Sequence, residues 1–364
     1  MNKIVSDEDW VEARKVLFKK EKLYFNVAVF AALAVMILAA APSILNLQQR
    51  SIAQEQQQPQ QQQTTYDPGK PIEDLSFEID NVTFSHHTAS VNGIQIHYVI
   101  GGQGDPVLLL HGWPQTWYEW RHVMPALAKN YTVVAPDLRG LGDSSKPVTG
   151  YDGNTTAEDL YQLISQLGFD KKIHLVGHDV GAQTAYSYAA IHPDNVSKLV
   201  IMDAVFPGFF PPNFEGTCWW CSFHQTRDVP ELLTAGNERE YLSWHYRGLA
   251  YNPEAITEAD IDTYVSSYSA PGGMRAGFEY YRAFPMNAEQ NKALSETKLQ
   301  IPVLALGGDI YPAFGGDAPG NFALDSTQGL AENVKGVIVP LSGHYIAEER
   351  PDFLIKELVK FFNG

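Results

Sequence analysis

Cysteine and basic residues are both scarce in this sequence. Cys218 and Cys221 are the only cysteines among 364 residues, which excludes a disulfide-rich scaffold and argues against a cysteine-based zinc site. Their C-x-x-C spacing has no thioredoxin-like surroundings, so we expect a local disulfide or plain packing there instead of redox chemistry. The 26 lysines and arginines are outnumbered by 42 acidic residues, and the net charge of −16 argues against a nucleic-acid partner.

Charge is missing altogether from residues 23–47, which read LYFNVAVFAALAVMILAAAPSILNL. At about 1.5 Å per residue, a helix of this length spans a hydrocarbon core of about 30 Å. Most of the flanking basic residues precede it, so the sequence predicts a single-pass membrane protein with a cytosolic leader, residues 1–22, and a lumenal or extracellular large domain. Ala39-Ala40-Ala41 resembles a signal-peptidase site, but Pro42 directly after it favours an uncleaved transmembrane anchor.

Residues 48–70 are rich in glutamine and poor in apolar residues. Such a stretch cannot bury enough surface to offset its chain entropy, so we expect a disordered linker. The whole sequence is 45% hydrophobic and 12% aromatic, which is enough to build a large core in the remaining residues. We therefore place the folded part of the chain from residue 71 onward.

Short apolar runs alternate with helical stretches from residue 77 onward, a rhythm typical of an α/β fold with a mainly parallel sheet covered on both faces. Residues 205–295 interrupt this rhythm with an aromatic-rich, helical texture, and we interpret them as a cap inserted between two core segments, 71–204 and 296–364. The expected strands are Ile94–Ile100, Pro106–Leu110, Tyr131–Ala135, Ile173–Val176, Lys198–Met202, Ile301–Leu306 and Gly336–Val339. The expected core helices are Trp117–Ala128, Thr155–Leu167, Ala182–Ile191 and Pro351–Phe362.

The stretch Gly177-His178-Asp179-Val180-Gly181 joins one of these strands to the following helix. A sharp turn with small residues on both sides is the sequence form of a nucleophile elbow, whose central side chain projects over the sheet edge. Most such turns carry serine, but this one carries Asp179. A carboxylate can attack a saturated carbon and leave an ester on the protein, which water must hydrolyse with help from a base and oxyanion donors. The plainer interpretation is a buried turn with an aspartate helix cap.

Two further segments supply candidates for the donors and the base. His111-Gly112-Trp113-Pro114 follows a strand, and the backbone N–H of Trp113 can pair with that of Val180 as an oxyanion hole. His344 follows the last strand, at the sheet edge to which the elbow points. It is the leading candidate base because the other histidines near the elbow or its helix have less suitable positions; these are His111, His178 and His192.

The residues alone do not decide which acid orients the base. Asp203 ends the strand LVIMD and Asp309 follows the strand VLALGG, so both side chains are expected at carboxyl ends of strands. Asp317 is a weaker third choice in a glycine-rich loop. Each of them could hold the imidazole of His344 in the right tautomer and stabilise its cation.

Together these residues resemble the epoxide hydrolase branch of the α/β-hydrolase superfamily, over roughly residues 75–362. The motifs that carry the resemblance are His111–Pro114, Asp137–Ser145 (DLRGLGDSS), Gly177–Gly181, Phe278–Ala283 (FEYYRA) and Gly343-His344. The resemblance implies conversion of an epoxide to a vicinal diol through an ester on Asp179, with no metal or organic cofactor. It also implies that Tyr281 donates to the epoxide oxygen, although Tyr280 and Tyr281 would otherwise be read as cap packing, and it favours Asp203 as the orienting acid.

One position departs from the pattern of this family. Members carry a second ring-opening donor, tyrosine or histidine, earlier in the cap. In the segment Cys218–His224 (CWWCSFH), Trp220 stands where that histidine would fall. His224 lies close by in the sequence, and an indole N–H can also donate a hydrogen bond, so the second donor stays open between His224, Trp220 and another residue.

Two other functions compete with epoxide hydrolysis. Haloalkane and fluoroacetate dehalogenases resemble the aspartate elbow, but they carry tryptophan or arginine directly after the nucleophile, and the fluoroacetate enzymes a second arginine three residues further; Val180 and Gln183 stand there. A non-catalytic, membrane-tethered binding domain would be expected to lack Asp179, His344 or Tyr281, and all three are present. Because the cap is rich in aromatic residues, the expected substrate is a small apolar epoxide.

Overall fold

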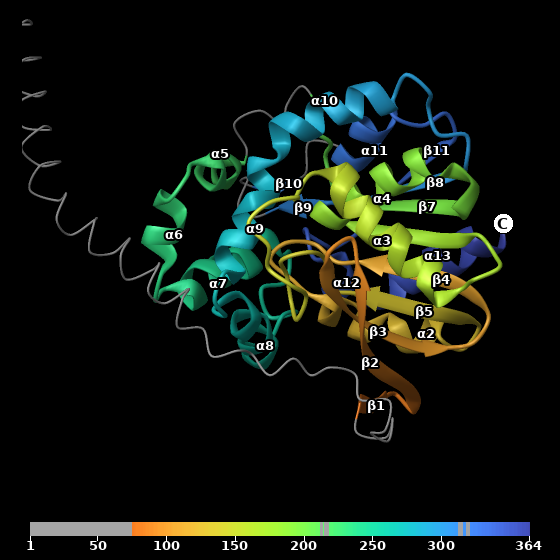
Figure 1. Cartoon of the computed structure of the whole chain (residues 1–364), viewed down its shortest axis with the longest axis horizontal. Helices are drawn as coiled ribbons and strands as arrows, with labels where there is room; N and C mark the ends of the chain where they lie inside the picture. The colour runs from red at the N-terminus through yellow and green to blue at the C-terminus, as the bar shows by residue number, and fades with distance from the viewer. Residues whose placement is uncertain (1–74, 212–213, 215–217, 312–315, 318–320) are drawn as a thin grey trace, which may run out of the picture. The chain divides into compact units, whose positions relative to one another are not determined.

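The fold is built on one nine-stranded sheet, in a computed structural model that describes residues 75–364 except 212–213, 215–217, 312–315 and 318–320 (Figure 1). The strand order is β1-β2-β3-β5-β4-β6-β7-β8-β11. β1, β2, β3 and β5 pair in antiparallel fashion, and all pairs from β5 to β11 are parallel, so the predicted mainly parallel sheet is confirmed. The strands are β1 Ser76–Ile79, β2 Val82–Val91, β3 Ile94–Gly102, β4 Asp105–Leu110, β5 Tyr131–Pro136, β6 Ile173–His178, β7 Val196–Met202, β8 Val303–Gly308 and β11 Val334–Val339.

Alternate residues of the central strands face two separate apolar cores. In β4, Leu108 and Leu110 belong to one core and Val107 and Leu109 to the other, and all four are buried. The first core includes residues of α3 Gly153–Leu167, α4 Val180–Ile191 and α11 Phe322–Thr327, and the second includes residues of η2 Trp117–His122, α2 Met124–Leu127, α12 Ile346–Glu349 and α13 Pro351–Asn363. Burial on both faces explains why these strands are continuous apolar runs in the sequence.

Two parts of the core differ from the expectation. The helix expected at 117–128 is a 3₁₀ turn, η2, followed by the short α2, because Pro125 lacks the N–H that a continuous helix would use. The first two strands, β1 and β2, are not among the expected ones. β2 reads VTFSHHTASV, and its mixed polar and apolar residues give a weak strand signal.

Among the described residues between β7 and β8 there are six helices, which form the cap on one side of the core (Figure 1). They are α5 Trp219–Gln225, α6 Val229–Thr234, α7 Glu238–Leu249, α8 Glu258–Tyr268, α9 Gly273–Arg282 and α10 Phe284–Leu294. A short 3₁₀ turn, η3 Pro193–Asn195, precedes β7, and a two-stranded sheet of β9 Ile310–Tyr311 and β10 Gly316–Asp317 follows β8. The domain boundaries at 71–204, 205–295 and 296–364 stay a prediction.

The prediction of a single-pass membrane protein is wrong. In the part of the chain that the structure describes, no helix is long and apolar enough to cross a bilayer. The longest described helix, α3, has 15 residues, which correspond to about 22 Å against a hydrocarbon core of about 30 Å. The predicted leader, anchor and linker, residues 1–70, lie outside the described residues.

A buried ion-pair network joins the cap to the core. Arg121 of η2 contacts Glu348 of α12 through both terminal nitrogens at 2.7 Å and Asp260 of the cap helix α8 at 3.0 Å. Tyr264, also in α8, donates to Glu348 at 2.5 Å. Burial raises the pKa of Glu348 to about 7, although Arg121 acts in the opposite direction. The guanidinium therefore contacts one carboxyl group from each side of the junction between cap and core.

Replacing Arg121 by methionine should lower the free energy of unfolding at pH 8 by roughly 3–5 kcal/mol, because Glu348 is left as an uncompensated buried charge. At pH 5.5 the loss should be smaller, since Glu348 can then take up a proton. Urea denaturation at both pH values measures the difference. Arg247→Met is the matched control: Arg247 pairs with Glu258 at the surface, where its side chain is 38% exposed, so less than about 1 kcal/mol is expected. An equal loss for the two variants would contradict the prediction.

Candidate active site

The turn between β6 and α4 holds Asp179 in a strained backbone conformation, with φ 49° and ψ −119°. Such values are rare for a residue with a side chain and cluster at functional sites. The flanking glycines permit the close approach that the turn needs. A Cβ at Gly177 would lie 2.6 Å from the carbonyl oxygen of Gly181, and a Cβ at Gly181 would lie 2.5 Å from that of His111. The predicted elbow is therefore present, with the Asp179 side chain 23% exposed.

The carboxylate of Asp179 lies between the predicted oxyanion loop and the predicted base. The backbone N–H of Trp113 donates to Oδ1 at 3.1 Å, and Nε2 of His344 lies 3.9 Å from Oδ2. Val180 begins α4, where the first backbone N–H groups have no acceptor within the helix. The loop therefore supplies one N–H donor to the carboxylate, and the pairing of Trp113 with Val180 as an oxyanion hole stays a prediction.

His344 is paired with Asp203 and not with Asp309. Nδ1 of His344 lies 2.5 Å from Oδ2 of Asp203, whose other oxygen accepts from the N–H of Gly308 at 3.2 Å. Asp309 instead accepts from the backbone N–H groups of Leu341 and Ser342, at 3.0 and 3.2 Å. The structure does not describe the side chain of Asp317, the third predicted acid. Both Asp203 and Asp309 contact the same loop, but of these two only Asp203 reaches the imidazole.

The remaining predicted histidines are engaged elsewhere. Nε2 of His111 accepts from the N–H of Leu138 at 3.1 Å, so its Nδ1–H donates to the carbonyl of Gly112 at 2.9 Å. His192 ends α4, at the far end of the helix from Asp179. Neither is placed to activate water near the elbow.

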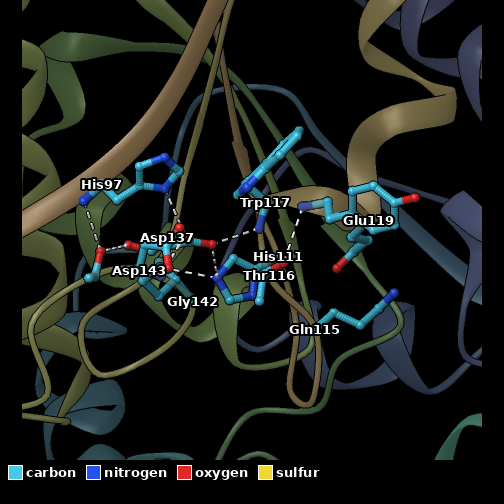
Figure 2. Close-up of polar contacts among 12 residues, drawn as sticks. His97, His111, Gln115, Thr116, Trp117, Glu119, Asp137, Gly142 and Asp143 are labelled. Carbon is cyan, nitrogen blue, oxygen red and sulfur yellow. Dashed lines mark hydrogen bonds and ion pairs between the residues drawn. The ribbon is translucent and has the colours of Figure 1, made fainter. Parts of the chain in front are cut away.

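A second carboxylate, Asp137, fixes the loop that carries Trp113 (Figure 2). Asp137 accepts from His97 Nδ1 at 2.8 Å and from the backbone N–H groups of Trp117 and Asp143, both at 2.9 Å. Burial would raise the pKa of Asp137, but the hydrogen bond from His97 and the charge of His97 hold it below the usual value. The ionised carboxylate ties β3 and the segment after β5 to the start of η2, directly behind the oxyanion loop.

His178 and Glu119 form a buried charged pair beneath the elbow, and the sequence analysis missed this role for both. Nδ1 of His178 lies 3.1 Å from Glu119, and its Nε2–H donates to the carbonyl of His344 at 3.0 Å. Glu119 also accepts from the N–H of Gly112 at 2.9 Å. Burial would lower the pKa of His178, but Glu119 and the nearby carboxylates of Asp179 and Asp203 outweigh it and raise the pKa to about 9. Since 59 residues of sequence separate the pair, no local pattern signals it.

The His178–Glu119 pair predicts a dependence of stability on pH. A histidine whose folded pKa lies above its unfolded value of about 6.5 contributes stability that is complete below pH 6.5 and is lost as pH rises through about 9. The free energy of unfolding should therefore fall by roughly 3 kcal/mol over this range from His178 alone. Urea denaturation between pH 6 and pH 10 measures it, and Glu119→Gln should flatten the slope. If wild type and Glu119→Gln show the same slope, His178 is not charged in the folded protein.

A cavity of about 90 Å³ opens above Asp179, with room for several waters or a small organic molecule. Its wall is mostly apolar and includes the cap residues Leu249 and Phe284. Among the described residues that line it, none is a lysine or an arginine. Tyr281 of α9 lines the cavity, and burial, followed by the charge of Asp179, holds its pKa well above the usual value near 10. Its phenol is therefore protonated at neutral pH and able to donate.

The two candidates for the second donor lie in different places. Trp220 lines the cavity. His224 does not: it is fully buried, and its Nε2 lies 2.5 Å from the hydroxyl of Tyr241. Cys218 and Cys221 form the local disulfide that the sequence analysis considered.

The chain is similar to known proteins over most of the residues that the structure describes. The family model described as alpha/beta hydrolase fold matches residues 105–351. The chain is 41% identical over 292 residues to the "Soluble epoxide hydrolase" of Corynebacterium sp. (strain C12), covering 76% of this chain and 97% of the relative. The solved structure "Epoxide hydrolase CorEH without ligand" superposes with a TM-score of 0.68 at 40% identity, covering 77% of this chain and 99% of that one.

A relative with a different name matches a shorter part of the chain. The "Fluoroacetate dehalogenase" of Burkholderia sp. is 43% identical over 187 residues, which cover 50% of this chain and 55% of that protein. The epoxide hydrolase relative matches nearly its whole length, and the family model covers most of the described residues. The chain therefore belongs to the α/β-hydrolase family, within the branch that contains the epoxide hydrolases.

Proposed function

We propose that the protein hydrolyses a small apolar epoxide to a vicinal diol through an ester on Asp179. The observation that carries this proposal is the arrangement of one cavity: a carboxylate nucleophile on a strained elbow, a buried phenol donor on the cap, and a histidine–aspartate pair beside them. The name of the Corynebacterium relative gives the same activity.

In the first step, an oxygen of Asp179 attacks an epoxide carbon and the carbon–oxygen bond of the ring breaks. The electron pair stays on the departing oxygen, which takes the proton of the Tyr281 phenol. Because the cavity is mostly apolar, water competes poorly for this proton and the phenol's hydrogen bond to the developing alkoxide is strengthened. The product of this step is an ester between the substrate and Asp179.

In the second step, His344 removes a proton from a water molecule that attacks the carboxyl carbon of Asp179. Asp203 fixes the tautomer of His344 and stabilises the imidazolium that forms. The N–H of Trp113, which already donates to Oδ1, and the N–H of Val180 hold the negative charge of the tetrahedral intermediate. As that intermediate collapses, the ester carbon–oxygen bond breaks and the departing oxygen takes the proton of the His344 imidazolium. The carboxyl group that remains loses its proton and Tyr281 regains one, so the diol is released and the carboxylate is restored.

Dehalogenation is the second candidate, because the same nucleophile can displace a halide and one relative is named a fluoroacetate dehalogenase. A haloacid, however, carries a carboxylate that needs a cationic partner in the cavity. Val180 and Gln183 occupy the two positions that arginine would fill, and the amide of Gln183 donates to the carbonyl of Val205 at 2.6 Å. The mostly apolar cavity therefore favours an epoxide over a haloacid.

The experiment is a substrate panel with an isotope readout. The full-length protein is incubated with aryl and aliphatic epoxides, haloalkanes and haloacids in ¹⁸O-labelled water, under single-turnover conditions. Because water attacks the carboxyl carbon of Asp179, the first turnover should place the label in Asp179 and leave the diol unlabelled. The His344→Gln variant should accumulate the ester as an increase in intact mass equal to the mass of the epoxide.

Each outcome assigns the protein to one class. Diol formation with a labelled aspartate supports the ester mechanism. Labelled diol with unlabelled protein would require direct attack of water on the epoxide. Halide release without diol formation would make the protein a dehalogenase, and no turnover on any substrate would favour a non-catalytic binding domain.

A further inference from the structure

Two tyrosine hydroxyls of the cap donate to the backbone at the end of the loop His111–Pro114. The O–H of Tyr246, in α7, donates to the carbonyl of Pro114 at 2.5 Å. The O–H of Tyr268, the last residue of α8, donates to the carbonyl of Gln115 at 3.0 Å. Both tyrosines are 1% exposed, and burial raises the pKa of each phenol well above the usual value near 10, so each keeps the proton that it donates.

The hydrogen bond from Tyr246 is the first of three that run through two peptide groups to the nucleophile. The carbonyl of Pro114 and the N–H of Gln115 belong to one peptide group, and that N–H donates to the carbonyl of Gly112 at 2.9 Å. The carbonyl of Gly112 and the N–H of Trp113 belong to a second peptide group, and that N–H donates to Oδ1 of the nucleophile at 3.1 Å. Because a peptide group is planar and rigid, holding its carbonyl oxygen restricts the direction of its N–H. The phenol of Tyr246 therefore acts on the N–H of Trp113 through these two groups.

The N–H of Trp113 matters more for the second step of the reaction than for the first. Ring opening moves negative charge from Asp179 to the epoxide oxygen, so a hydrogen bond to Oδ1 does not favour that step. Attack of water on the ester returns negative charge to Oδ1, and a donor that is already in place stabilises the transition state there. Hydrogen bonds in series also polarise one another, by roughly 10–30% per bond, which makes this N–H a stronger donor.

The side chain of Trp113 is also enclosed by the cap. A Cβ at Gly277, in α9, would lie 2.4 Å from the indole nitrogen. The ring centroids of His224 and His245 lie 4.6 and 4.8 Å from that of Trp113. Helices α7 and α9 contribute residues to the wall of the cavity as well. The helices that enclose the substrate therefore also hold the residue whose N–H faces the nucleophile.

We propose that Tyr246 and Tyr268 are positioning residues for hydrolysis of the ester, which hold the loop so that the N–H of Trp113 points at the oxygen that becomes negative. The inference rests on the proposed epoxide hydrolysis and names the groups that prepare its second step. When water attacks the carboxyl carbon of Asp179, a proton passes from the water to His344 and the electron pair of the carbonyl bond moves onto Oδ1. When that pair returns, the ester carbon–oxygen bond breaks and the departing oxygen takes the proton from the imidazolium.

The test follows the ester by intact mass in a single turnover of a reactive epoxide, with full-length protein in excess. All variants are made in the Asp203→Asn background, where a weakened base leaves the ester long enough to be followed. Tyr246→Phe removes the hydroxyl and keeps the ring. It should slow loss of the ester about 10-fold and leave its formation within about 2-fold. Tyr268→Phe should slow the loss about 3-fold, because its hydrogen bond lies one peptide group further from Trp113.

Tyr280→Phe is the matched control. The O–H of Tyr280, in α9, also joins the cap to a backbone carbonyl of the core, that of Arg139 at 2.9 Å, and the residue is 4% exposed. Arg139 lies outside the loop that carries Trp113. Tyr280→Phe should therefore shift the urea midpoint as much as Tyr246→Phe does, while both rates of the ester stay within about 2-fold of those of the background protein.

The outcomes separate positioning from packing. Slower loss of the ester in Tyr246→Phe, with normal formation, supports the inference. An unchanged rate of loss in Tyr246→Phe, equal slowing of both steps, or equal slowing in Tyr280→Phe would each overturn it while leaving the proposed function intact. Absence of ester and diol from every epoxide in the wild-type and Asp203→Asn proteins would overturn both.

Discussion

Asp179→Ala is expected to lower diol formation by at least about 10⁴-fold, because no other described carboxylate can replace the nucleophile. Asp203, the other acid that lines the cavity, is 2.5 Å from His344 and engaged with it. The comparison is made from initial rates with a reactive epoxide, corrected for uncatalysed hydrolysis. The His344→Gln variant that also carries Asp179→Ala should show no increase in intact mass.

The matched control for this variant is Asp194→Ala, which removes a fully exposed aspartate at the far end of the elbow helix. Its activity should equal that of the wild type. Circular dichroism on both variants checks that each is folded. Diol formation by folded Asp179→Ala at more than about one hundredth of the wild-type rate would mean that water attacks the epoxide directly, and the ester mechanism would be abandoned.

The elbow could be predicted because its physical requirements are local. The end of a strand, two glycines and the start of a helix must lie within a few residues of one another in the sequence. Gly177 and Gly181 have no room for a Cβ. The position of His344 followed from topology, since parallel strands bring their carboxyl ends to one sheet edge. These rules apply to any chain with this order of elements, so the positions of Asp179 and His344 at this edge of the sheet could be predicted from the sequence.

Partners that meet only in space could not be predicted in the same way. Asp203 and Asp309 both end neighbouring strands and both contact the loop that carries His344. Which one reaches the imidazole depends on side-chain directions that no spacing rule contains. The pairing of His178 with Glu119 likewise depends on how η2 packs under the elbow.

The membrane prediction failed for a different reason. It rested on the composition and flanking charge of residues 23–47. A local apolar run predicts the environment of a segment but does not determine it. The described helices bury their apolar faces in the two cores of the sheet or within the cap, and none of them could span a bilayer.

Asp203→Asn should leave ester formation nearly unchanged and slow its hydrolysis by about 10³- to 10⁴-fold, because an amide can hold His344 in the wrong tautomer and cannot stabilise its cation. The ester should then accumulate during turnover and be visible by intact mass, with a burst of one equivalent of consumed epoxide.

The matched control is Asp309→Asn, which weakens hydrogen bonds to two backbone N–H groups in the loop before His344. That change should cost about 1–2 kcal/mol of stability and leave hydrolysis of the ester close to the wild-type rate. The reverse pattern, with ester accumulating in Asp309→Asn and not in Asp203→Asn, would mean that the loop rearranges during catalysis and that Asp309 is the acid that serves His344.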